Sequence, residues 1–441
     1  MNLRTTATDL FLQTLKRVSV AETMQKQISC GNSILRIGDT SYFLRQFRRI
    51  VIIGMGKAAV SMFETLLPMI EPELDPNQTP EGILSCTVLP RRSDPRFQCF
   101  VGSHPIPSEH SISAAEAILN LLQRCDESCL VLFLLSGGAS AMVEKPLDHS
   151  IPLAQMARFH RALVQSGLPI TQINVLRKHF SAVKGGRLAI AAGGATQCTL
   201  LISDVPGNAL HMVGSGPSLP DPSTVDECRS IIESNLAALE LPDRVREFFR
   251  GPALPETPKP GHRSFIKAQA LSLLSSDDLC REASAIAAGL GFEVVIDNHC
   301  DDWDYRDAAS YLLDRIIALQ RKHPRICLLS AGEVAVKLGK EYGLGGRNQH
   351  FVLECARLIV ERGHPVTVLS GGSDGIDGNS LAAGAVCDET TLDRAHALGL
   401  DPTTALDRFS SFHLFDALGD TVITGPTGNN VRDLRILLMS A

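Results

Sequence analysis

The sequence has 441 residues, 44% of them hydrophobic, and its 48 acidic and 42 basic side chains give a net charge of −6. A chain of this length is typical of two or three domains, each with a sizeable core. The acidic balance and the lack of a long basic run argue against a nucleic-acid-binding surface. No run approaches the roughly 18 apolar residues of a membrane-spanning helix, so we expect no membrane partner.

Twelve cysteines are scattered from Cys30 to Cys387 and form no CxxC pair. The closest two, Cys125 and Cys129, have no His-rich companion segment with zinc spacing. Buried thiols in a reducing compartment are therefore expected. The N-terminal stretch shows neither a continuous apolar core nor a small-residue cleavage site, and these features together predict a cytoplasmic protein.

A first buried strand, at residues 50–53, runs into a turn formed by Gly54, Gly56 and Lys57 that opens a helix. The turn matches the relaxed dinucleotide-binding pattern GxGxxA, but the next strand does not deliver the acid that binds a ribose. A lysine here could neutralise a phosphate while the N–H groups of the helix start bind the phosphate oxygens. The alternative is an exposed lysine in the first helical turn.

A second buried strand ends in small residues, and its exit turn contains Ser136, Gly137, Gly138 and Ser140. This arrangement is typical of an anion-binding turn at the carboxyl edge of a parallel sheet. His104 lies between the two strands in a rigid turn before a proline. Histidines in such turns serve either structure or binding, and we keep His104 as a candidate binding residue.

Residues 173–187 carry four permanent cations and no carboxylate, although the chain is acidic overall. We predict a helix that ends at Gly185 and Gly186, and one side of this helix would present Asn174, Arg177, Lys178 and Lys184. Such a set of donors suits a phosphate or a carboxylate. The alternative is an ordinary solvated basic face.

A strand over residues 200–202 delivers Asp204 to the same edge of the predicted sheet. A carboxylate at this position can bind a metal or a substrate hydroxyl, or it can cap a turn. The segment 251–263 that follows contains four prolines within nine positions. This composition predicts a linker between two domains.

Beyond the linker, one strand ends at Glu333, and a glycine-rich loop places Arg347 and Asn348 at the entrance of an apolar helix. The planar guanidinium of an arginine at such a position can clamp an oxyanion. Asp374 and Asp377 lie three residues apart in a glycine loop, which suits either Mg²⁺ or simple turn formation. At least five strands thus end in Gly, Ser and Asp loops, which indicates two α/β domains facing a shared cleft.

The chain resembles the glycerate 2-kinase family, whose C-terminal part is the MOFRL domain, in motifs that follow the same order along nearly the whole sequence. The motifs are GMGKAA from Gly54, GSHPIP from Gly102, SGGASA from Ser136, NVLRKHFSAVKGGRLA from Asn174, SDV from Ser203, GSGP from Gly214, GLGGRNQ from Gly343, GGSDGIDG from Gly371, AAGAV from Ala382 and TGPTGNNVRDL from Thr424. The chain departs from the family pattern at Ala139, at Ala331 and at residues 274–278. These departures bear on substrate identity more than on reaction class.

The resemblance implies a Rossmann-like N-terminal domain with a parallel sheet at 1–250 and a C-terminal domain at 264–441. The MOFRL region would cover about 325–435, and the active-site cleft would lie between the domains. The implied reaction is the ATP-dependent phosphorylation of D-glycerate, most simply on the 2-hydroxyl, to 2-phosphoglycerate and ADP. Glycerate, ATP and Mg²⁺ are then the expected ligands of a monomer or homodimer.

The resemblance also assigns roles, because Lys57 and Arg347 stand at the family's catalytic lysine and arginine positions. We hypothesise that these two cations stabilise the transferring phosphoryl group, which spreads negative charge over its oxygens. The remaining basic residues would hold the glycerate carboxylate or the ATP phosphates, namely Arg177, Lys178 and Lys184. An acid would organise Mg²⁺ or the attacking hydroxyl, and the candidates are Asp204, Glu333 and Asp374, with Asp204 and Asp374 as metal ligands.

Two other classes of protein compete with this interpretation. An NAD(P)H-dependent hydroxypyruvate reductase would use the GxGxxA turn for its nicotinamide cofactor. A non-catalytic sugar-acid-binding protein would bind the ligand without consuming ATP. The missing ribose acid and the number of polar groups favour the kinase over both.

Overall fold

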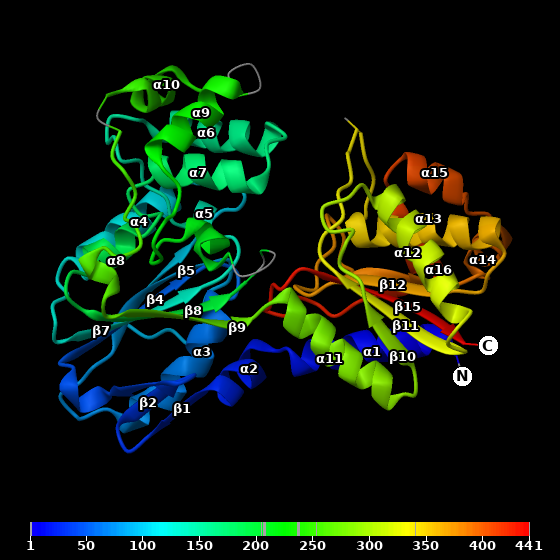
Figure 1. Cartoon of the computed structure of the whole chain (residues 1–441), viewed down its shortest axis with the longest axis horizontal. Helices are drawn as coiled ribbons and strands as arrows, with labels where there is room; N and C mark the ends of the chain where they lie inside the picture. Colours follow the sequence, from blue (N-terminus) through cyan, green and yellow to red (C-terminus); the bar gives the residue numbers. More distant parts are fainter. Residues whose placement is uncertain are drawn as a thin grey trace. The chain divides into compact units, whose positions relative to one another are not determined.

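The computed structural model describes residues 2–203, 205, 209–235, 239–252, 254–339 and 341–440. The chain divides into two compact units (Figure 1). Thr23–Leu273 forms the N-terminal unit, and Met1–Glu22 together with Leu274–Ala441 forms the C-terminal unit. Each unit has a six-stranded sheet with helices packed on it, which confirms the predicted class of two α/β domains. None of the described helices is long and apolar enough to cross a membrane.

The sheet of the N-terminal unit has the strand order β6-β5-β4-β7-β8-β9. Its strands are β4 (Arg49–Met55), β5 (Glu81–Cys86), β6 (Phe97–Val101), β7 (Cys129–Leu135), β8 (Thr196–Ile202) and β9 (Ala268–Leu274). The pairings from β6 through β8 are all parallel, and Ile53 lies opposite Ile83 on one side and Phe133 on the other. Strands β4 and β7 are buried along nearly their whole length, as expected for a parallel sheet with covered faces.

This strand order is that of a Rossmann fold. Strand β4 is first in the chain, β5 and β6 extend the sheet on one side of it, and β7 to β9 extend it on the other. The direction of winding therefore reverses between β4 and β7. Ligands of such sheets bind outside the carboxyl ends of the strands at this switch point, which here means the loops after Met55 and Leu135.

Helices cover this sheet and form an additional cluster within the N-terminal unit (Figure 1). Helices α3 (Ala59–Ile70) and α4 (Glu109–Leu122) contact the sheet, and α8 (Arg187–Ala191) contacts α4. The separate cluster consists of α6 (Leu153–Gln165), α7 (Ile170–Phe180), α9 (Val225–Ser234) and α10 (Asp243–Arg250). Its core contains the ring of Phe159, whose centroid lies 4.5 Å from that of Phe180 and 5.7 Å from that of Phe249.

Several short elements complete the described part of this unit. An antiparallel meander is formed by β1 (Ile28–Gly31), β2 (Ile34–Ile37) and β3 (Thr40–Phe43). The short helices are α2 (Val20–Gln27), α5 (Ala139–Met142), η1 (Leu44–Gln46), η2 (Glu71–Glu73), η3 (Leu210–Ser215) and η4 (Arg263–Phe265).

The proline-rich segment 251–263 packs within the N-terminal unit and does not link the two units as predicted. Leu254 belongs to the core of the helical cluster, Thr257 is 2% exposed, and the Pro258 carbonyl accepts a hydrogen bond from Asp221 N at 2.9 Å. The chain instead passes from one unit to the other after Glu22 and after Leu273. Proline content alone misled the prediction, because prolines also suit a buried extended segment without free N–H groups.

The sheet of the C-terminal unit is mixed, with the strand order β10-β11-β15-β12-β13-β14. Strands β10 (Glu293–Ile296) and β11 (Arg325–Ala331) are parallel. All the other pairings are antiparallel and involve β12 (Thr367–Gly372), β13 (Gly384–Cys387), β14 (Thr421–Val422) and β15 (Asp433–Ser440). One face is covered by α12 (Tyr305–Gln320) and α13 (Arg347–Arg362), with α14 (Thr391–Ala397), α15 (Pro402–Asp407) and α16 (Ser411–Leu418) around α13.

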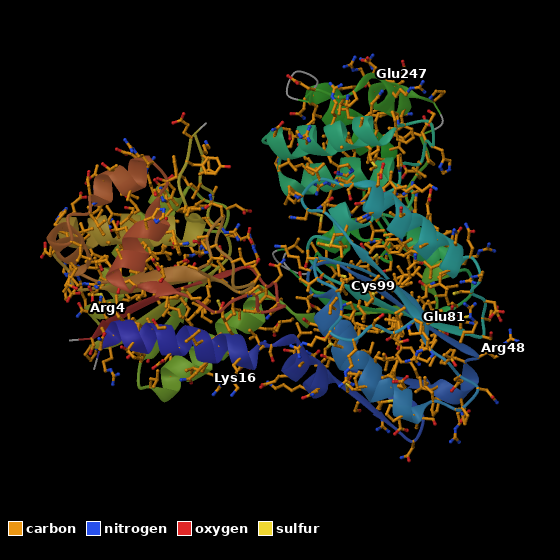
Figure 2. All side chains as sticks on the ribbon, turned by 180° about the vertical axis from the view of Figure 1, so that it is seen from behind. Arg4, Lys16, Arg48, Glu81, Cys99 and Glu247 are labelled. Carbon is orange, nitrogen blue, oxygen red and sulfur yellow. The ribbon has the colours of Figure 1, made fainter. Side chains whose placement is uncertain are left out.

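The other face of this sheet is covered by α11 (Ser276–Gly289) and by the N-terminal helix α1 (Leu3–Arg17) (Figure 1). Phe11 of α1 is fully buried against β12, where a Cβ atom at Gly371 would lie 2.6 Å from the phenyl ring. Figure 2 shows Arg4 and Lys16 at opposite ends of α1, and Arg4 pairs with Asp420 at 3.1 Å. Residues 1–22 therefore pack in the C-terminal unit, whereas the sequence placed them in a domain of residues 1–250.

Candidate active site

The turns after β4 and β7 interlock at the switch point of the N-terminal sheet. Ser136 N donates to the Met55 carbonyl at 3.0 Å, Lys57 N donates to the Gly137 carbonyl at 2.9 Å, and Ala58 N donates to Ser136 Oγ at 3.0 Å. Gly56 has a φ of +113°, and a Cβ atom there would lie 2.5 Å from the Ser136 carbonyl oxygen. Glycine is therefore required at Gly56 for the two turns to approach each other.

In the first turn, the N–H groups of Gly56, Lys57, Ala58 and Ala59 all donate within the protein, which does not favour the predicted phosphate-binding role of Gly54 and Gly56. Besides the bonds of Lys57 and Ala58, Gly56 N donates to the Ser85 carbonyl at 3.0 Å, and Ala59 N donates to the Gly56 carbonyl at 3.3 Å. A dinucleotide-binding turn needs these donors for the pyrophosphate. The GxGxxA match therefore reflects the packing of two turns.

The second turn has the donors that the first one lacks. Gly138 has a left-handed φ of +88°, and the N–H groups of Gly137 and Gly138 donate to no acceptor in the described part of the chain. A Cβ atom at Gly138 would lie 3.3 Å from Lys57 Cγ and 3.5 Å from His104 Cδ2. The structure thus brings the predicted residues Lys57, His104 and Gly138 together in a turn suited to an anion.

His104 is uncharged at neutral pH. The protein packed around the imidazole ring lowers its pKa to about 4, and the positive charges of Lys57 and Arg177 act in the same direction, although part of the residue remains exposed. These charge effects also place Arg177 near the same turn. We call the group of Lys57, His104, Gly137, Gly138 and Arg177 the switch-point site.

A chain of hydrogen bonds lies beside the switch-point site and includes two more predicted residues. Ser140 Oγ and Ser215 Oγ are 2.7 Å apart, and Ser215 Oγ donates to Asn174 Oδ1 at 2.7 Å. Asn174 is 3% exposed, and its amide nitrogen lies 3.8 Å from the Met212 sulfur. Ser140 and Asn174 therefore connect the β7 turn with helix α7.

The basic stretch folds differently from its predicted form. Helix α7 ends at Phe180, and Ser181 leaves it in an extended conformation, so Gly185 and Gly186 are not the end of this helix. Lys178 is 2% exposed, and its Nζ lies 3.0 Å from both Asp221 Oδ1 and His211 Nδ1. The predicted ligand-binding role of Lys178 is therefore replaced by a buried ion pair.

Lys184 is also neutralised inside the protein. Its Nζ donates to Glu144 Oε2 at 2.6 Å and to the Val143 carbonyl at 3.0 Å, and both charged side chains are at most 1% exposed. Burial alone raises the pKa of Glu144, but Lys184 and His160 outweigh it and hold the pKa at about 2. Local sequence could not reveal the partners Glu144 and Asp221, because each is more than 35 residues away from its lysine.

Among the described residues, neither Arg177 nor Arg187 of this stretch has a carboxylate at ion-pair distance, but Arg187 donates to the backbone carbonyls of Lys178 and Lys184. Arg177 differs from it. Its Nε is buried without a hydrogen-bond partner, and burial lowers its pKa while the more distant Glu144 partly opposes this shift. An unpaired cation in such surroundings is costly unless an anion binds to it. Arg177 is therefore the strongest ligand-binding candidate of the basic stretch.

In the C-terminal unit, Arg347 is the first residue of α13 and contacts two carboxylates. Its Nε lies 2.5 Å from Asp433 Oδ2, and its Nη2 lies 3.1 Å from Asp433 Oδ1 and 2.7 Å from Glu333 Oε1. Burial lowers the pKa of Arg347, but Asp433 and Glu333 outweigh this effect and raise it. The sequence analysis missed Asp433, although it stands in the quoted TGPTGNNVRDL motif.

Asp377 caps helix α13. Its carboxylate accepts hydrogen bonds from the backbone N–H groups of Asn348 at 3.0 Å and Gln349 at 2.9 Å, and from both of their side-chain amides. Asn348 Oδ1 also accepts a bond from Ser370 Oγ at 2.6 Å. Asp377 and Asn348 therefore fix the start of the helix that carries Arg347, which accounts for Asp377 without Mg²⁺.

Asp374 lies close to the arginine site. A Cβ atom at Gly372 would lie 3.2 Å from Asp374 Oδ1 and 3.3 Å from Asp433 Oδ1, so the two carboxylates approach the same point. No group of three or more His, Cys, Asp or Glu side chains in the described ranges could hold a metal ion by itself. Asp204, the other metal candidate, lies outside the described residues.

Comparisons with known proteins identify the relatives of this chain. A family model described as a domain of unknown function, DUF4147, matches residues 6–250, and the MOFRL family model matches residues 326–433. The chain is 32% identical to a "D-glycerate 2-kinase" of Thermotoga maritima over 89% of this chain and 91% of that protein. It is 34% identical to a "Putative hydroxypyruvate reductase" of Agrobacterium vitis over 89% of this chain and 87% of that protein.

The same likeness holds in three dimensions. The crystal structure of a glycerate kinase from Thermotoga maritima superposes with a TM-score of 0.81 and 28% identity, and the match covers 99% of each chain. The resemblance inferred from the motifs is thereby confirmed. This chain belongs to the glycerate 2-kinase family, with a DUF4147 domain followed by a MOFRL region.

Proposed function

We propose that this protein is a kinase that transfers the terminal phosphoryl group of ATP to the 2-hydroxyl of D-glycerate, giving 2-phosphoglycerate and ADP. The observation that carries the proposal is the switch-point site, which brings Lys57, Arg177 and two N–H groups without an acceptor among the described residues to the ligand-binding edge of a Rossmann-like sheet. Family membership supports the same reaction, because relatives covering most of the chain carry the glycerate 2-kinase name.

The chemistry suits these residues, because phosphoryl transfer asks a protein mainly for positioning and for stabilisation of negative charge. In our proposal, Lys57 and the N–H groups of Gly137 and Gly138 donate to phosphate oxygens. Arg177 holds the glycerate carboxylate, and the neutral His104 accepts a hydrogen bond from a substrate hydroxyl. Lys178 and Lys184 are left out of this set, because their ammonium groups are paired with Asp221 and Glu144.

We further propose that Arg347 donates to the oxygens of the transferring phosphoryl group. A guanidinium group held by Asp433 along one edge retains N–H donors on its other edge, and such a fork matches phosphate oxygens. The task assigned to Arg347 is the same as that of Lys57, so each residue should be needed for turnover. Each is a charge clamp of the kind that stabilises a transition state by about 2.7 to 4 kcal/mol.

Mg²⁺ enters the proposal as the companion of ATP. An ion that is already bound to phosphates needs only one or two protein carboxylates, and Asp374 can supply one of them. The ion would neutralise phosphate charge. The twelve cysteines are all free thiols, which supports our proposal that the protein works in a reducing compartment such as the cytoplasm.

The experiment that tests this function measures product formation by the purified full-length chain with four candidate substrates in parallel: D-glycerate, L-glycerate, tartronate and hydroxypyruvate. Release of ADP that depends on D-glycerate supports the kinase. Oxidation of NADH or NADPH by hydroxypyruvate would support the reductase name carried by the Agrobacterium vitis relative instead. The occupied N–H groups of the Gly54–Lys57 turn predict that no such oxidation occurs.

A further inference from the structure

Glu144 is a fully buried carboxylate that faces two cations. Lys184 Nζ lies 2.6 Å from Glu144 Oε2, and both side chains are at most 1% exposed. His160 Nε2 lies 2.9 Å from the same oxygen, but burial lowers the pKa of His160 to about 4, so the imidazole is uncharged at neutral pH. The second cation is Arg177, because burial lowers its pKa and the charge of Glu144 opposes this shift.

Backbone pairing holds this carboxylate beside the end of helix α7, which carries Arg177. Ala182 N donates to the carbonyl of Lys145, the residue after Glu144, at 2.7 Å. The Arg177 carbonyl accepts a hydrogen bond from Ser181 N at 3.2 Å, one residue before that pairing. The Glu144 carboxylate is therefore kept close to the last turn of α7.

Lys184 is the cation that Glu144 neutralises directly. Its ammonium group also donates to the Val143 carbonyl at 3.0 Å, which fixes it beside the carboxylate. In the part of the chain that the structure describes, Arg177 has no carboxylate at ion-pair distance, and its Nε is buried without a hydrogen-bond partner. Two cations thus share one carboxylate, and the positive charge that is left over belongs to Arg177.

We propose that Lys184 is a positioning residue that neutralises Glu144 and thereby leaves the guanidinium of Arg177 to the carboxylate of glycerate. This inference rests on the proposed function, because it assumes that Arg177 binds that carboxylate. A buried carboxylate without a partner is costly, so in the absence of Lys184 the Glu144 side chain takes Arg177 as its counter-ion. Lys184 therefore controls substrate binding without touching the substrate.

The first test measures the dissociation constant of D-glycerate by calorimetry for the full-length protein and its Lys184→Met variant. ADP is present in every sample so that no transfer occurs, and sucrose supports the folding of the less stable variants. Competition from Glu144 for Arg177 should weaken D-glycerate binding about tenfold or more, the range for lost hydrogen bonds to a charged group. The positioning role fails if Lys184→Met binds D-glycerate as tightly as the wild type.

The second test adds Glu144→Gln to Lys184→Met. Removal of the carboxylate releases Arg177 again, so the double variant should bind D-glycerate within about threefold of the wild type. If Lys184 contacted the substrate directly, the double variant would bind as weakly as the single one, and this result would overturn the proposal. Because the double variant retains neither charge of the pair, it decides between these roles even if Lys184→Met does not fold.

The matched control is Lys178→Met, which breaks the other buried ion pair of the basic stretch. Lys178 Nζ lies 3.0 Å from Asp221 Oδ1, and both side chains are at most 2% exposed, so thermal melting should show a comparable loss of stability. The carboxylate that acts on Arg177 is Glu144, however. Lys178→Met should therefore bind D-glycerate within about threefold of the wild type. Equal weakening by both lysine variants would contradict the competition for Arg177.

These tests separate the inference from the proposed function. If the wild type phosphorylates none of the candidate substrates, the proposed function fails, whatever the variants do. If the wild type phosphorylates D-glycerate but Lys184→Met binds it with unchanged affinity, only the role of Lys184 fails.

Discussion

The N–H group of Lys57 donates to the carbonyl oxygen of Gly137 at 2.9 Å, and this bond joins the turn after β4 to the turn after β7. The turn after β4 matches the GxGxxA pattern of a dinucleotide-binding loop, but this bond makes it a support for the turn after β7. In our proposal, the anion-binding donors are the N–H groups of the second turn, beside the side chain of Lys57. This relationship distinguishes the proposed kinase site from a nicotinamide site.

Replacement of Lys57 by alanine should lower kcat with D-glycerate by about 100-fold or more, because a charge clamp on the transferring group is lost. Steady-state kinetics measure the change, and thermal melting should show a folded protein. The matched control is Lys145→Ala in the same unit, whose ammonium pairs with Glu116 at 2.8 Å. Retention of most of the wild-type turnover by Lys57→Ala would refute the catalytic assignment.

Replacement of Gly56 by alanine should destabilise the N-terminal unit by more than about 2 kcal/mol, because the new Cβ meets Ser136 and the φ of +113° is strained for alanine. Urea unfolding measures this cost. Gly31→Ala is the control, since nothing lies within 4 Å of its Cβ position, and it should change stability by less than about 1 kcal/mol. Equal effects at both glycines would show that the interlocked turns are not the cause.

Replacement of Lys184 by methionine should destabilise the protein by about 3 to 5 kcal/mol, because Glu144 is left buried without its ammonium partner. Adding Glu144→Gln should recover part of this loss. Chemical denaturation of the single and double variants measures both effects. A Lys184→Met protein with wild-type stability and a raised KM for ATP would instead restore the ligand-binding role predicted from the sequence.

Replacement of Arg177 by glutamine should raise the KM for D-glycerate by about tenfold to a hundredfold, the range expected for hydrogen bonds to a charged group. The KM for ATP should change much less, because we assign Arg177 to the substrate carboxylate. Arg177→Lys keeps the charge and should show a smaller defect. A change confined to the KM for ATP would move Arg177 to the nucleotide instead.

Acid should destabilise the C-terminal unit through His350, which is 2% exposed. Burial lowers its pKa to about 4, against about 6.5 in an unfolded chain, so below pH 6.5 the unfolded state binds a proton that the folded state does not. Stability should therefore fall as the pH drops from 6.5 towards 4, and the contribution of His350 between pH 7 and 4.5 is about 2 to 3 kcal/mol.

The variant His350→Gln should flatten this dependence when unfolding by urea is followed at pH 7 and at pH 4.5. The exposed His364 provides the matched control, and His364→Gln should keep the wild-type dependence. If both variants lose stability in acid as steeply as the wild type, His350 is not the group that titrates.

The sequence predicted the features of this protein that depend on local pattern. Buried strands that end in small residues identified β4 and β7, and with them the switch point that joins Lys57, His104 and Gly138. Glycine spacing also led to Arg347 at the start of α13. The resemblance to the glycerate 2-kinase family, confirmed by the comparisons, rested on the same turns.

The features that the sequence did not predict depend on partners that are distant in the chain. Lys178 and Lys184 looked like a cationic surface because Asp221 and Glu144 lie far from them in sequence and meet them only in the fold. Asp377 looked like a metal ligand because its carboxylate has no partner nearby in the sequence. The helix that it caps begins 30 residues earlier. Residues 1–22 pack in the C-terminal unit because the burial of Phe11 against Gly371 needs a strand more than 300 residues away.

Proton-coupled phosphorus NMR of the product is the most direct test of the central claim. The wild-type protein is incubated with ATP and D-glycerate, and the new phosphomonoester signal is recorded. Phosphorylation of the 2-hydroxyl predicts a doublet, because one proton is attached to the carbon that carries the phosphate. A triplet would place the phosphate on the 3-hydroxyl, and the absence of any new phosphomonoester would contradict the proposed kinase.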